Sequence, residues 1–478
     1  MIRLCLIGNS YKYELENIIK LFFPGERVTT EKAFDTAQIT AQKDGLALSV
    51  TLFYQNVTTK QTERAEGEND CERLLCQMLF LLLCERTGIR PAWGIQTGVR
   101  PVKLLRRLVL QNGWEKAEQI FKEKFLITDE KFQLAKQTLQ NQERLLQYLG
   151  ENTFSLYISI PFCVSRCSYC SFISHDVEKS AKLIPSYIDR LCEEIEHTGK
   201  IARQLGLRLL TVYIGGGTPT AISAQALQKV CDAVHKNFET EHLLEFTIEA
   251  GRPDTITPEK LDVMRDAGAT RISINPQTLN DAVLKEIRRN HTKEDFYRAY
   301  DMAVQKGFDN INTDLIAGLG KESVASFQNT IAEIIKLDPA CVTVHTLAVK
   351  RSSRLVYQGQ AQYRPQDDAV SQMLSFSHTV LAKAGYRPYY MYRQSAMAGN
   401  NENIGWAKPG YESYYNVFIM EEMQTILAVG AGASTKLVSE NGEKIQRIFN
   451  YKYPYEYISG FDEMKRRKEK ILAFYTAT

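Results

Sequence analysis

Residues 156–172, LYISIPFCVSRCSYCSF, decide the fold of this chain. From 156 to 160 apolar residues alternate with Tyr157 and Ser159, and this period of two predicts a β-strand. Pro161 ends the strand, because its ring removes a backbone donor and fixes φ. A loop that is rich in cysteine follows at once.

Cys163, Cys167 and Cys170 form the pattern C-x3-C-x2-C. Three thiols so close in sequence lie on one loop and can converge on one centre. A structural zinc site normally has four nitrogen or sulfur ligands, and only His175 stands near enough to be a fourth. An iron–sulfur cluster that is held by three thiolates and keeps one iron open fits the pattern better.

The chain has 478 residues, of which 44% are hydrophobic and 24% charged, and its net charge is +3. This length predicts two or three domains, and so small a charge does not favour nucleic acid as a partner. The start shows no apolar signal segment. The most apolar run, 74–84, is about half as long as a membrane span. We expect a cytoplasmic protein without membrane insertion, whose other cysteines are free thiols in apolar surroundings.

Residues 1–150 read as a separate α/β domain. Strands are expected at 3–8 and 46–55, and helices at 70–86, 102–110, 114–124 and 130–150. The sequence does not say what this domain does.

From about residue 152 on, short β-rich runs alternate with helical patterns. The expected strands are 156–160, 210–215, 244–250, 271–275, 311–316 and 341–347. Helical patterns lie between them at 186–204, 223–237, 258–267, 279–288, 293–306 and 323–336. Six such units predict a parallel sheet wound in one sense, and an open partial barrel rather than a closed one of eight strands.

Polar residues stand at the carboxyl ends of these strands, where parallel α/β barrels place their sites. The run GGGTPT at 215–220 lets backbone approach a ligand closely, and it lacks the Lys-Ser/Thr of a nucleotide phosphate loop. Glu249, Gln277 and Asp314 stand at the next three ends, and Arg289 follows Gln277. Because they fall in one layer, they predict a shared cofactor site.

The C-terminal region is dense in tyrosine, and its last helix is expected at 461–476. Lys465, Arg466, Arg467 and Lys468 are adjacent on that helix, and we expect them to form a solvated face.

Taken together and in this order, these motifs resemble the oxygen-independent coproporphyrinogen III oxidase family of radical S-adenosylmethionine (SAM) enzymes, in the branch called HemZ. The resemblance covers about residue 150 to the C-terminus. It implies a radical SAM partial (β/α)6 barrel at 151–385, with an N-terminal α/β domain at 1–150 and a small substrate-covering domain at 386–478. It also implies that the three cysteines hold a [4Fe–4S] cluster and that two SAM molecules bind side by side.

The resemblance assigns site residues by motif. The first SAM, on the open iron, would contact Tyr157, Gly216 and Glu249. The second position would be lined by Tyr169, Gly217, Thr218, Gln277, Arg289 and Asp314, and by Ala348 on spacing alone. No residue is assigned a catalytic role beyond binding.

In the implied reaction, an electron from the cluster cleaves SAM to methionine and a 5′-deoxyadenosyl radical. The radical takes a hydrogen from the β-carbon of a propionate, and loss of CO2 and one electron leaves a vinyl group. Two such steps convert coproporphyrinogen III to protoporphyrinogen IX in porphyrin and heme biosynthesis. The implied partners are a tetrapyrrole substrate, an electron donor and an electron acceptor, the last two unidentified.

Two other functions stay open: heme binding or transfer with the cluster retained, and radical SAM chemistry on heme itself. Heme-chaperone relatives carry H-N-x-x-Y-W after a similar G-Y-E segment. Here residues 415–420 read YNVFIM, so Tyr415 replaces the histidine and the Tyr-Trp pair is missing. His345 is the remaining candidate for an axial heme ligand. This departure counts against heme transfer.

Overall fold

The structure is a computed structural model that describes residues 1–31, 37–150, 152–172, 174–348, 350, 353, 367–394, 397, 400–439, 442 and 444–476. The chain forms two compact units. One comprises Met1–Leu139 with Tyr392–Glu402, and the other Gln140–Met391 with Asn403–Thr478. The functional division at residues 150 and 385 stays a prediction.

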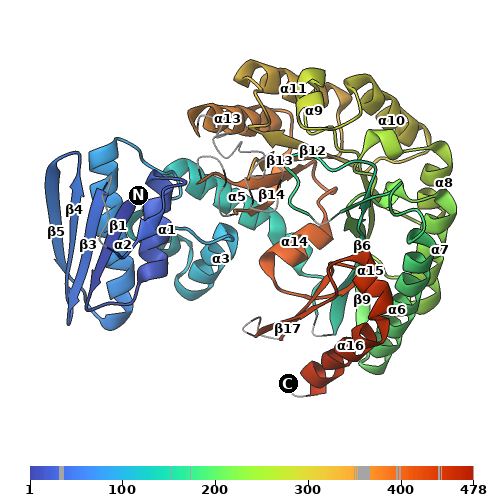
Figure 1. The fold of residues 1–478 in the computed structure, drawn as a ribbon, viewed down its shortest axis with the longest axis horizontal. Coiled ribbons are helices and arrows are strands. Elements are labelled where there is room, and N and C mark those ends of the chain that lie inside the picture. Colours follow the sequence, from blue (N-terminus) through green and yellow to red (C-terminus); the bar gives the residue numbers. More distant parts are fainter. Residues whose placement is uncertain are drawn as a thin grey trace. The chain divides into compact units, whose positions relative to one another are not determined.

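The first unit is built on a five-stranded sheet in the order β2-β1-β3-β4-β5, in which β4 is antiparallel to both neighbours. Its elements are β1 (Ile2–Ile7), α1 (Lys12–Phe22), β2 (Val28–Thr29), β3 (Ala37–Asp44), β4 (Ala47–Tyr54), β5 (Val57–Arg64), α2 (Cys71–Thr87), α3 (Pro101–Asn112), α4 (Trp114–Gln119) and the start of α5 (Asp129–Leu146). Burial alternates along β3 and β4, because α1 and α2 cover one face of the sheet (Figure 1).

The segment Tyr392–Glu402 completes this first unit, although the second unit precedes and follows it in sequence. Glu402 is 0% exposed. Its carboxylate accepts hydrogen bonds from Trp93 Nε1 at 2.7 Å and from the buried Lys131 Nζ at 2.6 Å. A buried cation that has lost such a partner is costly, so the segment is an integral part of the unit.

The second unit is built on an eleven-stranded sheet in the order β14-β15-β13-β12-β11-β10-β9-β6-β16-β17-β18. Its six central strands are parallel neighbours in chain order: β6 (Thr153–Ile160), β9 (Arg208–Gly216), β10 (Glu245–Glu249), β11 (Arg271–Ser273), β12 (Ile311–Ala317) and β13 (Cys341–Thr346). The helices between them are α6 (Ile184–Gln204), α7 (Ala224–Asn237), α8 (Pro258–Asp266), α9 (Asp281–Glu286), α10 (Lys293–Gln305) and α11 (Val324–Leu337). They lie along the outer side of the curved sheet (Figure 1), so the predicted partial (β/α)6 barrel is confirmed.

The two faces of this barrel differ in chemistry. The face under the helices is apolar, with Ile158, Ile214 and Ile248 all buried on successive strands. The inner face is polar, and its buried groups bond to one another, as where the Thr211 hydroxyl donates to Ser155 Oγ at 2.7 Å. The alternation therefore directs polar side chains inward along each strand.

Further elements extend the sheet on both sides. They are β14 (Arg387–Tyr392) and β15 (Asn403–Ala407) beyond β13, and β16 (Thr425–Val429), β17 (Ser434–Val438) and β18 (Ile445–Phe449) beyond β6. The remaining helices are α13 (Asp367–Lys383), α14 (Tyr414–Glu421), α15 (Pro454–Ser459) and α16 (Phe461–Thr476), and β7 (Phe162–Cys163) pairs with β8 (His175–Asp176). In the part of the chain that the structure describes, no helix is long and apolar enough to cross a bilayer.

Helix α16 shows that one prediction was wrong. Lys465, Arg466 and Arg467 do pair with acidic residues one turn earlier on the helix, but Lys468 is 0% exposed. Its ammonium donates to the carbonyl of Ala428 and lies 3.2 Å from the buried carboxylate of Glu194. Successive helix residues point about 100° apart, so the fourth of four adjacent basic residues turns inward.

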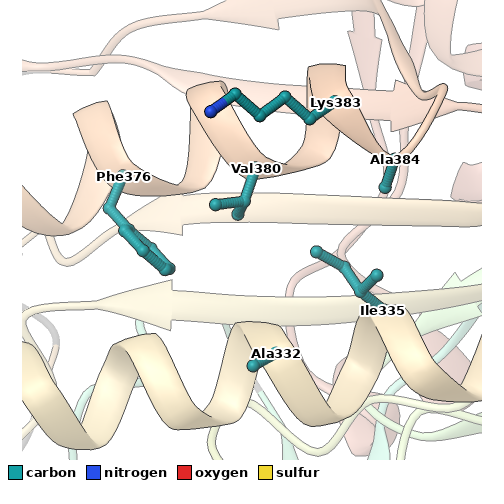
Figure 2. Close-up of a pocket in the computed structure, with 6 residues that line it drawn as sticks. All are labelled: Ala332, Ile335, Phe376, Val380, Lys383 and Ala384. Carbon is teal, nitrogen blue, oxygen red and sulfur yellow. The ribbon is translucent and has the colours of Figure 1, made fainter.

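A shallow pocket of about 370 Å³ lies in the outer helix layer, between α11 and α13 (Figure 2). Its lining is Ala332, Ile335, Phe376, Val380, Lys383 and Ala384. None of these is a predicted site residue.

Candidate cofactor site

The cysteine loop is held by backbone bonds to two other segments and by one bond within itself. Val177 N donates to the carbonyl of Cys163 at 2.9 Å, Ser168 N to that of Ile287 at 3.0 Å, and Cys170 N to that of Cys167 at 3.2 Å. Cys163 and Cys167 are buried and Cys170 is half-buried. The three thiols thus lie on one fixed, largely enclosed loop.

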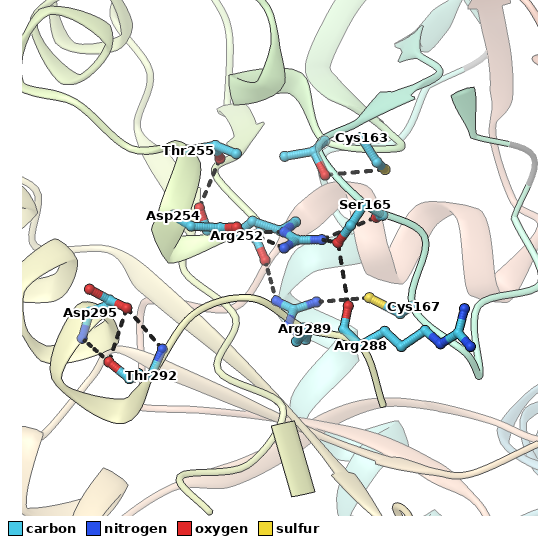
Figure 3. Close-up of polar contacts among 12 residues, drawn as sticks. Cys163, Ser165, Cys167, Arg252, Asp254, Thr255, Arg288, Arg289, Thr292 and Asp295 are labelled. Atoms are coloured by element: carbon cyan, nitrogen blue, oxygen red, sulfur yellow. Dashed lines mark hydrogen bonds and ion pairs between the residues drawn. The ribbon is translucent and has the colours of Figure 1, made fainter. Parts of the chain in front are cut away.

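Two buried arginines, Arg252 and Arg289, contact this loop (Figure 3). Arg252 Nη1 donates to the carbonyl and to the hydroxyl of Ser165, at 3.1 and 2.7 Å. Arg289 Nη1 approaches Cys167 Sγ at 3.9 Å and Tyr169 Oη at 3.4 Å. Fixed positive charge beside the sulfurs favours negatively charged ligands there.

Burial is the main influence on the thiols themselves. Burial raises the pKa of Cys170 to about 11. It also raises the pKa of Cys163, although the hydrogen bond from the Thr218 hydroxyl acts to lower that pKa. A bound metal takes the place of the thiol proton. Within the described residues, no three His, Cys, Asp or Glu side chains converge as the ligands of a single ion would. The thiolates of a [4Fe–4S] cluster bind separate irons and need not converge in this way.

The glycine loop packs directly on the cysteine loop. A Cβ at Gly217 would lie 2.7 Å from the carbonyl oxygen of Phe162 and 3.0 Å from Cys163 Sγ, so only glycine fits. Gly216 has φ +116°, a backbone conformation open mainly to glycine. Thr218 N donates to Phe162 O at 2.8 Å, and its hydroxyl lies 3.4 Å from Cys163 Sγ. The predicted residues Gly216, Gly217 and Thr218 therefore adjoin a predicted cluster ligand.

Two acidic residues lie on the inner face: Glu249 at the end of β10, as expected, and Asp314 in the middle of β12 rather than at its end. Tyr213 Oη donates to Glu249 Oε1 at 2.5 Å, and burial raises the pKa of Glu249 to about 7. Asp314 accepts from Asn312 Nδ2 at 2.8 Å and lies 3.6 Å from His345 Nε2. Burial acts to raise the pKa of Asp314, but the bonds from His345 and Asn312 outweigh it and hold this pKa below its usual value. At neutral pH Asp314 is thus an anion, whereas Glu249 is near its midpoint.

The other predicted site residues are Gln277, Tyr169 and Ala348. Gln277 has φ +69°, an uncommon conformation for a residue with a side chain, and its buried Oε1 has no hydrogen-bond partner in the structure. Tyr169 packs on an apolar cluster that includes Ile287 and Leu347. Ala348 is half-buried just beyond β13. The bond from Gln277 N to Asp314 O, at 2.9 Å, joins the segment that follows β11 to the middle of β12.

Sequence reasoning missed two residues of this site, Tyr213 and Arg252. Tyr213 pairs in register with Tyr157, and its ring forms one cluster with those of Tyr157, at 6.2 Å, and Tyr415, at 4.5 Å. Arg252 stands three residues after Glu249, and no motif marked it. The sequence does contain a signal for Tyr213. This residue stands two positions before Gly215 on the same strand, so strand alternation places both on the inner face.

The comparisons with known proteins agree with this geometry. The sequence model of the Radical SAM superfamily matches residues 157–334. The oxygen-independent coproporphyrinogen-III oxidase-like protein HemZ of Bacillus subtilis (strain 168) is 39% identical over 396 residues, 82% of this chain and 79% of that protein. The heme chaperone HemW of Lactococcus lactis is 30% identical over 321 residues, 67% and 77% of the two chains.

Among solved structures, the radical SAM enzyme coproporphyrinogen III oxidase (HemN) of Escherichia coli aligns with a TM-score of 0.54 at 24% identity, over 67% of this chain and 72% of that one. The fold and the cysteine loop thus define a radical SAM protein, a class that uses a [4Fe–4S] cluster and SAM. Within that class, the chain belongs to the oxygen-independent coproporphyrinogen III oxidase-like family that includes HemZ.

Replacement of Glu249 by alanine tests its predicted contact with SAM. We expect the variant to keep the iron of the wild type but to lose reductive formation of 5′-deoxyadenosine by at least about tenfold, since a hydrogen bond to a charged group is worth about 1.5–3 kcal/mol. Iron analysis and chromatography of 5′-deoxyadenosine measure the two properties. Wild-type 5′-deoxyadenosine formation would leave Glu249 with a purely structural role.

Proposed function

We propose that this protein catalyses the oxygen-independent oxidative decarboxylation of coproporphyrinogen III, turning two propionates into vinyl groups. The observation that carries the proposal is the position of Arg289. This buried residue, assigned by motif to the second SAM, lies between Cys167, Tyr169 and the carbonyl of Gly251. A place for a second SAM beside the cluster serves such a reaction and has no use in a carrier. The names of HemZ and HemN support the same substrate class.

In this proposal the side chains hold and shield the cofactors. Cys163, Cys167 and Cys170 would hold the cluster, while Thr218 and Arg289 stabilise negative charge on its sulfurs. When bound, the cluster and SAM supply electron transfer and hydrogen-atom abstraction. Glu249 would accept hydrogen bonds from SAM, and the backbone N–H groups of the glycine loop would donate hydrogen bonds to it. The apolar cluster that includes Ile287, Ile316 and Leu347 limits access of water to Tyr169.

Anaerobic incubation with coproporphyrinogen III, SAM and a reductant, followed by mass analysis of the products, tests the proposal. We expect a monovinyl intermediate and then protoporphyrinogen IX, with 5′-deoxyadenosine formed in step. A loaded cluster that cleaves SAM without any change in the porphyrinogen would overturn it. Consumption of heme in the same assay would point to chemistry on heme instead.

Arg289→Ala is the informative variant in this assay. Loss of a buried charged donor costs about 1.5–3 kcal/mol, so turnover should fall by about tenfold or more while iron content stays unchanged. Arg288→Ala is the matched control, because Arg288 is the adjacent arginine but is exposed, and the contact with Cys167 in Figure 3 comes from Arg289. Equal turnover in the two variants would remove Arg289 from the site.

Heme transfer is the second candidate, favoured by the 30% identity to HemW. In this chain Tyr415 is 4% exposed and its ring stacks on that of Tyr213, with centroids 4.5 Å apart. A ring packed in this way is poorly placed to ligate heme. We therefore expect weak, non-stoichiometric heme binding that Tyr415→Phe does not change. Tight one-to-one binding that this substitution abolishes, without decarboxylation, would establish the carrier.

A further inference from the structure

Tyr213 holds Glu249 through a short hydrogen bond, although no motif pointed to it. We propose that Tyr213 is a positioning residue for SAM: it keeps Glu249 in the form and orientation that accept hydrogen bonds from SAM, and so sets the pH range of SAM binding. The inference rests on the role of Glu249 under the proposed function. It goes further in naming the residue that controls that role.

The geometry fixes the phenol hydroxyl of Tyr213 in one place. The ring of Tyr213 stacks on that of Tyr415, with centroids 4.5 Å apart and planes at 25°, and the ring of Tyr157 lies near both, 6.2 Å from Tyr213 and 6.3 Å from Tyr415. The Tyr213 hydroxyl meets Glu249 Oε1 at 2.5 Å. A ring that packs in this cluster of three tyrosines and bonds to Glu249 has little freedom to turn its hydroxyl away.

Gly215 shows that the chain makes room for this pair. A Cβ at that position would lie 2.9 Å from Tyr213 Cε1 and 3.2 Å from Glu249 Cδ. Any side chain at 215 would therefore force the two groups to shift. The glycine loop therefore packs against the inner face of the barrel at Tyr213 and Glu249.

Glu249 faces titratable groups on every element around it: Tyr157 on β6, Tyr213 on β9, Asp314 on β12, His345 on β13 and Tyr415 on α14. Burial raises the pKa of Glu249 to about 7; the Tyr213 hydroxyl and His345 act to lower it, and Asp314 to raise it. Burial raises the pKa of Tyr213 well above its usual value, so this hydroxyl stays protonated and donates.

The sign of the pH effect follows from these contacts. A carboxylate accepts hydrogen bonds from an ammonium group or a ribose hydroxyl, and its protonated form does so less well. SAM binding should therefore strengthen as pH rises through the pKa of Glu249 and weaken below it. Removal of the Tyr213 hydroxyl takes away a bond to the charged form, so the pKa of Glu249 must rise and binding must move to higher pH.

Tyr213→Phe tests this on cluster-loaded, unreduced protein, with anaerobic equilibrium dialysis of labelled SAM at pH 7 and pH 9. A hydrogen bond to a charged group changes a protonation equilibrium by about tenfold, so the Kd should rise about fivefold at pH 7 and less than about twofold at pH 9. Titration of SAM itself affects both proteins equally and cancels in the ratio. Tyr415→Phe, which removes a hydroxyl from the same stack but not the bond to Glu249, should keep the wild-type pH dependence.

Glu249→Gln separates this inference from the proposed function. It should bind SAM weakly at both pH values and show no midpoint near 7. Suppose that Glu249→Gln binds SAM weakly at both pH values, while Tyr213→Phe binds SAM like the wild type or more weakly by the same factor at both. The positioning role of Tyr213 is then overturned, and the proposed reaction is unaffected. If Glu249→Gln binds SAM like the wild type, the inference also fails, and the decarboxylation assay still decides the reaction by itself.

Discussion

Replacement of Cys167 by alanine is expected to abolish assembly of the [4Fe–4S] cluster and leave the fold intact. Two thiolates and an open iron position do not hold a cubane cluster firmly, and the Arg289 guanidinium would face a methyl group in place of sulfur. Iron content after anaerobic reconstitution should fall from about four per chain to near zero. Iron and sulfide analysis, together with the visible absorption of the cluster, measures the amount of cluster per chain.

Cys231→Ala is the matched control for this result. Cys231 is a buried thiol on α7, outside the cysteine loop, and burial raises its pKa to about 12. The control should load iron like the wild type, because a buried thiol of this kind acts as a small hydrophobic group. A full cluster in Cys167→Ala, or only zinc in anaerobically purified wild type, would contradict the assignment of the loop.

Replacement of Lys468 by methionine is expected to lower the free energy of unfolding by about 3–5 kcal/mol, because it leaves the buried carboxylate of Glu194 without its cation. That carboxylate would keep only neutral donors, which include Tyr457 Oη at 2.6 Å and Gly430 N at 2.8 Å. Denaturant unfolding followed by circular dichroism measures the change.

Two further variants make this prediction specific. Lys465→Met, on the same helix at a side chain 37% exposed, should change stability by no more than about 0.5 kcal/mol. Combining Lys468→Met with Glu194→Gln should recover part of the loss, since the second change removes the unpaired charge. A loss of stability as small as that of Lys465→Met would show that Lys468 does not pair strongly with Glu194.

Much of the barrel could be predicted because its signal is local. Each central strand alternates an apolar face, which the helices cover, with a polar inner face, and this period of two is visible in a single strand such as 156–160. In the first unit the signal was weaker: α1, β3 and β5 were missed, and β3 and β5 are rich in Gln, Thr and Lys. Those strands exist because of their neighbours in the sheet, which a local pattern does not show.

The site divides in the same way. Cys163, Cys167, Cys170 and the glycine run carry their own spacing, so the sequence pointed to them directly. Strand alternation alone places Tyr213 on the inner face, but its role, like that of Lys468, depends on a partner far along the chain, Glu249 or Glu194. The roles assigned to individual SAM contacts remain predictions that the variants above can decide.

The hydrogen bonds that Glu402 accepts from Trp93 and Lys131 have a consequence for folding during translation. Domains emerge from the ribosome at about 5–20 residues per second, so residue 402 follows residue 139 by about 13–50 s. During that interval Lys131 would lack the carboxylate that it meets in the finished unit. The first unit to be translated is therefore among the last to be completed, and a fragment that ends at residue 139 should behave as an unfinished folding intermediate rather than as a free domain.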